Sequence, residues 1–349
     1  MSSTEPVPET RMMPGDELSA DDAFLALRHY GRWPLLRDAF VRFRYGDGFS
    51  HSRALALQLC LAIVPFLIAL SGLASDLGAA EGGRVIADSV VALTPGASQS
   101  LVRDLLGEDT AAGERAGRGD EDDDDNDAGE LALTLGLITG MVALTTAMAQ
   151  IERGANRIYG VERDRPALQK YLRAATLAVV AGLPALFGFL LLVAGRSAGD
   201  SAAAQFGWSG AVRTTWDFVR WPLSLLLIVF AVGLLFEKSP RRKQPALSWL
   251  LFGAAISTVL WWLASLLLAG YVRFSEGFVA TYGPLTAVMA LLLWANLTGI
   301  ALFLGIAFAA QLEAQRVGVT RPALTDRWHP GTGDDPAGGA ASVRPEPSG

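Results

Sequence analysis

The stretch LTAVMALLLWANLTGIALFLGIAFAA, residues 285–310, carries no charged side chain from one end to the other. About 20 predominantly apolar residues are enough for a helix to cross a bilayer. Five further apolar runs precede it, so that the expected spans lie at about 54–74, 131–149, 172–193, 222–236, 248–269 and 285–310. The sequence therefore predicts an all-α, polytopic membrane bundle of six transmembrane helices.

The composition agrees with a membrane protein. Hydrophobic residues make up 51% of the chain and charged residues 18%, whereas soluble domains carry about 25% charged residues. The net charge of -6 comes largely from the acidic run at 120–127 and from the two tails. The first fifty residues contain no apolar signal-peptide core, so we expect the first span to act as its own insertion signal.

Lysine and arginine alternate in density along the connections between the runs. They are dense before the first run, between the second and third, between the fourth and fifth, and after the sixth. The positive-inside rule places these four segments in the cytoplasm, with both termini there and the protein in the cell (inner) membrane. The cluster Lys238–Lys243 supports the shortest span, 222–236, because without that span the cluster would lie outside.

The chain divides at changes in composition. Residues 1–20 and 317–349 are rich in Pro, Gly, Ser and acidic residues, and we expect disordered tails there. The transmembrane domain is expected at 47–316, with an acidic outer loop at 75–130. The remaining segment, 21–46, is expected to form an amphipathic helix on the cytoplasmic side.

This helix places Leu36, Phe40 and Phe43 at helical spacing, with Arg37, Arg42 and Arg44 on the other face. Two interpretations stay open. The helix either lies in the membrane interface with its arginines on anionic headgroups, or packs on the cytoplasmic loops.

Several residues inside the spans indicate how the bundle is built. Small residues at intervals of four let helix backbones approach closely, and Gly136, Gly140 and Gly305 are expected to do so. Pro65 and Pro184 fall within spans one and three, where a proline removes a backbone hydrogen bond and bends the helix. We interpret both as structural kinks.

Polar side chains concentrate at the cytoplasmic ends of the spans. No Asp, Glu, Lys or Arg lies near the centre of any run, which argues against an ion-coupled pump that uses a buried charge. Asn296 is the polar residue most costly to bury unpaired. Together with it, the residues expected to bound a cavity or contact a substrate are Gln58, Gln150, Glu152, Asn156 and Arg165. An ion-pair scaffold is the favoured interpretation of Glu152 and its neighbours, and the floor of a cavity is the alternative.

Nothing in the sequence predicts catalysis, a metal site or a cofactor. The three histidines, His29, His51 and His329, are far apart. The acidic run resembles a calcium loop from Asp122, but Leu133 stands where that loop needs its final glutamate. We therefore expect no enzyme, no metal and no cofactor.

Three segments in order are similar to the YihY/BrkB family of integral membrane proteins, formerly labelled ribonuclease BN. They are Asp47-Gly48 with Ala54–Leu70 and Pro65; Glu152-x3-Asn156-x-Ile158-Tyr159-x-Val161 with Arg165; and Tyr282-Gly283-Pro284-Leu285 with Leu293-Trp294, Leu304-Gly305 and Gln311-Leu312-Glu313. The likeness spans roughly residues 30–316. The chain departs from the family pattern at Leu57-Gln58 and in the stretch after Gly305. The resemblance implies a six-helix inner-membrane protein of poorly defined function.

Two functions from different classes follow. The first is a transporter or lipid-handling protein for an anionic or polar substrate, with membrane lipids as partners. The alternative is a non-catalytic structural or scaffolding protein of the cell envelope, and a homo-oligomer is left open. No nucleic-acid partner is expected, because the positive-inside rule already explains the arginines.

Overall fold

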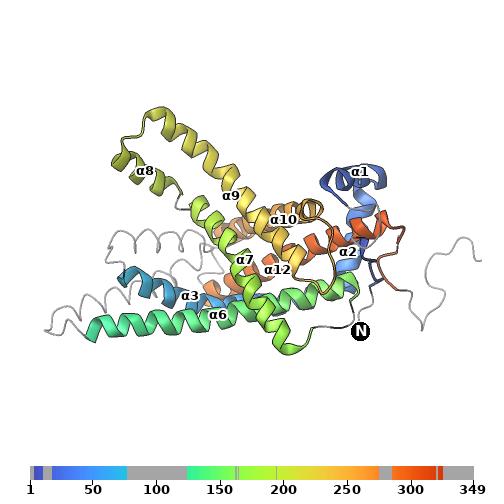
Figure 1. The fold of residues 1–349 in the computed structure, drawn as a ribbon, viewed down its shortest axis with the longest axis horizontal. Helices are drawn as coiled ribbons and strands as arrows, with labels where there is room; N and C mark the ends of the chain where they lie inside the picture. The colour runs from blue at the N-terminus through green and yellow to red at the C-terminus, as the bar shows by residue number, and fades with distance from the viewer. Residues whose placement is uncertain are drawn as a thin grey trace, which may run out of the picture.

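The computed structural model describes residues 4–10, 18–76, 124–161, 163, 165–193, 195–274, 285–319 and 321–324. The regular structure of these residues is helical, apart from one antiparallel bridge between Thr4 and Ala323. In chain order the helices shown in Figure 1 are α1 (Ala20–Tyr30), α2 (Arg32–Tyr45), α3 (Gly48–Asp76), α6 (Asp124–Tyr159), α7 (Ala167–Val193), α8 (Gly195–Phe206), α9 (Gly210–Lys238), α10 (Leu247–Phe274) and α12 (Leu285–Arg316). The predicted all-α class is confirmed for the described residues.

Five helices within the described residues, α6, α7, α9, α10 and α12, are long and apolar enough to cross a membrane. The first predicted span lies in α3, which runs without a break through Pro65 to Asp76. The sixth crossing and the orientation of the termini stay predictions. The predicted acidic outer loop lies almost wholly outside the described residues, although α6 begins within the acidic run, at Asp124.

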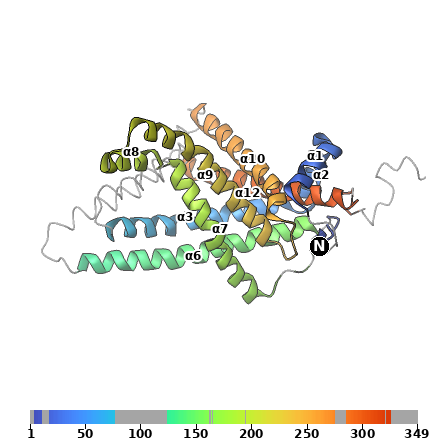
Figure 2. The same ribbon diagram turned by 45° about the horizontal axis from the view of Figure 1, so that its top comes forward.

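Helix α12 lies at the centre of the bundle. It packs against α3, α6 and α10, while α3 also packs along α6, and α7 packs against α9 (Figures 1 and 2). Half of the most apolar stretch of α12 is buried, against 22–33% for the other four candidate spans. The outer helices therefore expose large apolar side chains, among them Ile138, Val142, Leu183, Phe187, Leu226, Trp262 and Leu267. Such a surface is suited to lipid rather than to water.

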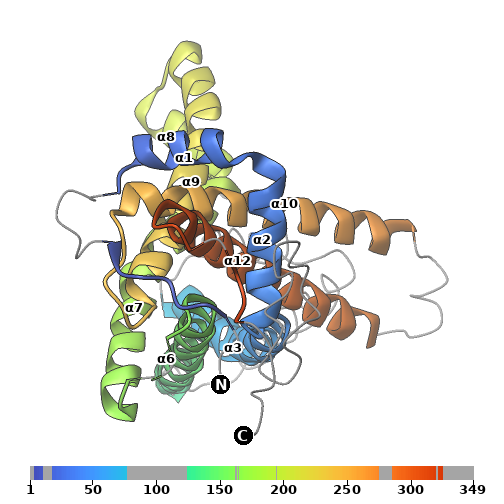
Figure 3. The same ribbon diagram turned by 90° about the vertical axis from the view of Figure 1, so that its right-hand side faces the viewer.

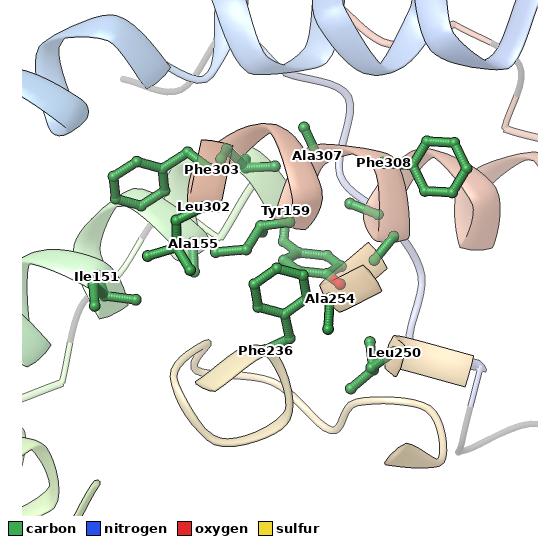
Figure 4. Packing of buried hydrophobic residues seen from close by; sticks show 14 of the residues in the cluster. Ile151, Ala155, Tyr159, Phe236, Leu250, Ala254, Leu302, Phe303, Ala307 and Phe308 are labelled. Atoms are coloured by element: carbon green, nitrogen blue, oxygen red, sulfur yellow. The ribbon is translucent and has the colours of Figure 1, made fainter. Parts of the chain in front are cut away.

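Small residues set the distance between α10 and α12. A Cβ atom placed on Gly305 would lie 2.6 Å from the Ser257 Cβ and 2.7 Å from the Gly253 carbonyl oxygen. Between α6 and α12, the missing Cβ of Gly154 leaves room for the ring of Phe303. Figure 4 shows this ring, Leu302 and Ala307 of α12 packed with Ala155 of α6 and Phe236 of α9. Without a hydrophobic effect between helices in lipid, close packing of this kind supplies the association energy.

The other residues that the sequence singled out inside the spans differ in how closely they are packed. Gly136 is buried in α6, and a Cβ on Gly140 would meet only the Pro65 side chain, at 4.0 Å. Pro184 lies inside α7, which continues through it. Pro222 likewise lies inside α9, because this helix begins at Gly210, well before the predicted span 222–236.

Two expectations for the N-terminal region need correction. The single helix expected at 21–46 is two helices, α1 and α2, which meet at Gly31 with a φ of 80°. Residues 1–20 were expected to form a disordered tail, but residues 4–10 pack on the protein, and Thr4 and Thr10 are each 1% exposed. This segment, called the N-terminal strap below, packs across the end of the bundle and bonds to residues far away in the chain.

The connection between α7 and α9 contains a helix that the sequence did not indicate. In α8 the residues are mostly small or polar, so that no apolar period marks the helix. Tertiary contacts hold it: the indole nitrogen of Trp216 on α9 donates to the Gly195 carbonyl oxygen at 2.7 Å, and Trp208 packs edge-on against Trp216.

Candidate functional site

The arginine-dense segments lie together at one end of the bundle. Figure 3 looks toward this end, where α1 and α2 cross the C-terminal part of α12. The last turn of α6, the connection between α9 and α10 and the N-terminal strap also reach it. We call this the basic end. The sequence grouped these segments by charge alone, and the structure adds the contacts among them.

Glu152, Asn156 and Arg165 form one cluster at the basic end. The Glu152 carboxylate, 4% exposed, pairs with the Arg165 guanidinium at 2.8 Å. Arg165 also donates to the carbonyl oxygens of Ser239 and Pro240 at 3.2 and 3.0 Å. The fully buried Asn156 accepts the backbone N–H of Arg241 through its side-chain oxygen at 2.7 Å. These contacts hold the α9–α10 connection against α6, in the scaffold arrangement that the sequence favoured.

The other three predicted residues lie away from this cluster, along the contact of α3 with α6 and α12. They are Gln150, Gln58 and Asn296. The side-chain nitrogen of Gln150 lies 2.8 Å from Nδ1 of His51 on α3. The side-chain oxygens of Gln58 and Asn296 are buried and have no hydrogen-bond partner among the described residues. An acceptor buried without a partner costs about 1–3 kcal/mol, so these two positions are energetically expensive.

The register of the helices places Gln58 and Asn296 at a similar depth. Helix α12 is crossed by α2 and runs antiparallel to α3 (Figure 1): Arg42 of α2 bonds to Gln311, and farther along the bundle Ser52 of α3 lies against Gly299. Asn296 is one turn beyond Gly299, and Gln58 is between one and two turns beyond Ser52. We call this depth the polar level.

A second buried cluster, which the sequence analysis did not identify, surrounds Glu313 on α12. Both terminal nitrogens of Arg242 donate to its carboxylate, at 3.0 and 2.7 Å, and the two side chains are 2% and 0% exposed. The Thr10 hydroxyl donates to the same carboxylate at 2.8 Å. The guanidinium also stacks on the ring of Tyr159, 4.5 Å from its centroid. This is a bidentate ion pair sealed from water, the kind in which removing one partner is costly.

Arg42 lies next to this cluster and is fully buried. Its Nε donates to the Gln311 side-chain oxygen at 2.8 Å, and its Nη1 donates to the carbonyl oxygens of Glu5 and Ile158. All these acceptors are neutral, and among the described residues Arg42 makes no ion pair. Burial lowers the pKa of its guanidinium to about 10; nearby Arg242 acts in the same direction, whereas Tyr159, Glu5 and Glu313 act in the opposite one. The expectation that Arg42 faces lipid headgroups is therefore wrong.

The apolar residues of α2 that do not pack on the bundle are exposed on its surface. Leu35, Ala39 and Phe43 pack on the bundle, whereas Trp33 is 83% exposed and Phe40 47% exposed. The packed face confirms that α2 lies on the rest of the protein. Its contact with lipid stays a prediction.

The sequence missed Arg42, Arg242 and Glu313 for a physical reason. Arg42 and Arg242 lie in segments rich in basic residues that the positive-inside rule already explains, and nothing in the local pattern separates a buried arginine from an exposed one. The available signal was the acidic Glu313 within an otherwise apolar helix end, since a carboxylate in that position needs a partner.

No metal centre is visible in the part of the chain that the structure describes, where no three residues among His, Cys, Asp and Glu gather closely enough to hold an ion.

Comparison with known proteins identifies the family. The profile of the virulence factor BrkB family matches residues 39–328, which is most of the chain. The chain belongs to the BrkB family. It is 27% identical over 281 residues to the ribonuclease-like protein YfkH of Bacillus subtilis, covering 80% of this chain and 96% of that protein. It is also 27% identical over 293 residues to a UPF0761 membrane protein of Chromohalobacter salexigens, covering 80% of this chain and 63% of the relative. No solved structure matches.

Membership in the BrkB family, together with five apolar helices of spanning length, makes this a membrane protein. The family is not a recognised enzyme family, although YfkH is described as ribonuclease-like. The matched range begins inside α2 and extends past α12, so it includes Arg42, Arg242 and Glu313 as well as the residues that the sequence singled out.

Proposed function

We propose that this BrkB-family protein moves an anionic or polar substrate, or the polar headgroup of a lipid, across the inner membrane. One observation carries the proposal: at the polar level the side-chain oxygens of Gln58 and Asn296 are buried and find no hydrogen-bond partner in the part of the chain that the structure describes. Within a bilayer no bulk water is present to satisfy such groups. An amide retained there at this cost is suited to accept hydrogen bonds from a passing polar group or from the water that accompanies it.

The surroundings favour a polar group over a bare ion. His51 and Gln150 lie between the polar level and the basic end, so that hydrogen-bonding side chains continue along α3 and α6. Thr298 on α12 bonds to its own helix, at the Trp294 carbonyl oxygen, and adds no charge. Arginines at the basic end would attract an anionic substrate from solution, and the positive-inside rule assigns that end to the cytoplasm.

A flux assay tests this proposal. Purified protein is reconstituted in liposomes, and the exchange of fluorescent lipids between leaflets is measured beside the uptake of labelled anionic solutes. We expect flux in the wild type and its loss in the double variant Gln58→Leu/Asn296→Leu, which keeps the side-chain size and removes both acceptors. The control is Thr139→Val on α6, because Thr139 is exposed and bonds only to its own helix.

Flux that persists in a folded Gln58→Leu/Asn296→Leu protein would refute the assignment of the polar level. Absence of flux for every tested substrate, with correctly folded wild type, would favour the second candidate, a non-catalytic scaffold. That candidate rests on the Glu152–Arg165 pair and on Asn156, whose side chains bind the protein's own backbone. Neither candidate involves catalysis or a cofactor.

A further inference from the structure

Two buried arginines at the basic end have more positive charge and more donors than the described residues around them can match. Among the described residues Arg42 donates only to neutral acceptors, the carboxylates of Glu5 and Glu313 act on it without a direct bond, and Arg242 shares the single carboxylate of Glu313. Nη2 of Arg42, Nε of Arg242 and the side-chain nitrogen of Gln311 have no hydrogen-bond partner among the described residues. Because a buried cation without a counter-charge is costly, the cluster is suited to an anion.

Further donors border the same cluster. Gln244, 3% exposed, has neither end of its side-chain amide paired within the described part of the chain. The Tyr159 hydroxyl lies beside this amide. An oxyanion with several acceptor oxygens would satisfy this set better than a single neutral group, and guanidinium groups match phosphate oxygens in pairs.

The N-terminal strap closes this cluster with backbone oxygens. The Glu5 carbonyl oxygen accepts from Arg42 at 2.9 Å, and the Pro8 carbonyl oxygen accepts from Arg242 at 2.9 Å. Each arginine thus donates one N–H group to a carbonyl oxygen of the strap, and the same N–H group could instead donate to an anion. Neutral carbonyl oxygens are weaker partners for a guanidinium than charged phosphate oxygens are.

The strap is held by contacts that can open without unfolding the bundle. Two of its other bonds join backbone groups: the Val7 N–H donates to the Tyr159 carbonyl oxygen, and the Glu5 N–H donates to the Pro322 carbonyl oxygen. Three more involve side chains: the Thr10 hydroxyl donates to Glu313, the Thr4 hydroxyl donates to the Arg157 carbonyl oxygen, and the Glu9 carboxylate accepts the Lys243 N–H. The strap makes about as many hydrogen bonds as it has residues. The entropy lost on ordering a residue is similar in size to the net gain from one such bond, so that the docked state is finely balanced.

We propose that Arg42 and Arg242 form a binding site for a phosphate group, and that the N-terminal strap occupies this site as a plug which the phosphate group displaces. The group belongs either to a free phosphate compound or to a lipid headgroup, because both present the same oxygens to the arginines. Binding exposes the strap and frees the α6 end, and this regulation does not depend on which substrate the protein moves.

The test measures whether the strap is open. In full-length protein with Cys60→Ser, the substitution Val7→Cys places one thiol at a position only 7% exposed, and its labelling by a maleimide reports opening. Labelling is followed in micelles of a phosphate-free detergent such as dodecyl maltoside, first with pyrophosphate added and then with phosphatidic acid mixed into the micelles. We expect each addition to accelerate labelling tenfold or more. Acceleration by phosphatidic acid alone assigns the site to headgroups, and acceleration by pyrophosphate alone assigns it to free compounds.

Variants separate the site from general charge effects. Arg42→Gln and, in case that protein does not fold, Arg242→Lys should abolish the response, whereas Lys238→Gln should keep it, since Lys238 is an exposed residue paired with Glu237. Gly160→Ala should open the strap without any anion, because the new Cβ would lie 2.7 Å from the Pro6 Cα. No acceleration by either phosphate source in the wild type would overturn the proposal. So would an unchanged response in a folded Arg42→Gln or Arg242→Lys protein.

Discussion

Replacing Glu313 by glutamine should destabilise this protein more than any single charge removal at its surface. The glutamine keeps the shape and one acceptor oxygen but leaves Arg242 buried without a counter-charge, beside the equally buried Arg42. Breaking a buried ion pair in this way costs about 3–5 kcal/mol. The two Arg242–Glu313 hydrogen bonds, at 3.0 and 2.7 Å with both side chains almost fully buried, place this pair within that class.

The assay is equilibrium unfolding in mixed micelles, with helicity as the signal and the free energy of unfolding as the result. The matched control is Glu237→Gln, because Lys238 in that pair is 49% exposed and surface pairs contribute about 0–1 kcal/mol. The double variant Arg242→Met/Glu313→Met removes both charges together and should recover most of the loss. If Glu313→Gln stayed within about 1 kcal/mol of the wild type, or the double variant were no more stable than the single one, the reasoning from buried charge would be refuted.

Three further predictions concern packing, the α9–α10 connection and pH. Gly305→Ala should lower the free energy of unfolding by about 1–3 kcal/mol through overpacking against α10. Gly270→Ala, where a Cβ would meet no atom of the described residues within 4 Å, should change it little, and equal effects would contradict the packing argument. Asn156→Ala should speed hydrogen exchange at the Arg241 amide, because that N–H loses its acceptor, and unchanged exchange would argue against the scaffold role. A hydrogen bond from the backbone N–H of Ser19, the helix cap, lowers the pKa of Asp22 below its usual 3.8. The resulting stabilisation of α1 is present above pH 3.8 and is lost as the pH falls through the lowered pKa. An NMR titration that finds an ordinary pKa for Asp22 would exclude this stabilisation.

The helical class and most of the helix positions could be predicted from local sequence. Long apolar runs can form little else in lipid, because a helix satisfies its own backbone hydrogen bonds. The boundaries were less predictable. Helix α9 begins at Gly210, twelve positions before the expected start at Pro222. Its first turns carry polar residues that interrupt the apolar run, and Pro222 lies in the interior of the helix rather than at its start.

The candidate site was predictable only in part. Glu152, Asn156 and Arg165 were recognised as polar residues at a span end. The structure pairs Glu152 with Arg165, and Arg165 and Asn156 both bond to the 239–241 backbone. Gln58 and Asn296 were named separately, and the antiparallel register of α3 and α12 places them at one depth.

The sequence by itself determined that this chain is a helical membrane protein with its basic segments grouped on one side. The length of an apolar run and the density of lysine and arginine beside it are local properties, and insertion into a bilayer depends directly on both. The tertiary structure decided which of the charged residues are buried and with what. Arg42, Arg242 and Glu313 come from three separate segments, and the strap that covers them lies more than 230 residues from Arg242 along the chain. Whether a charge faces lipid headgroups or a buried partner depends on these long-range contacts, and no local pattern contains them.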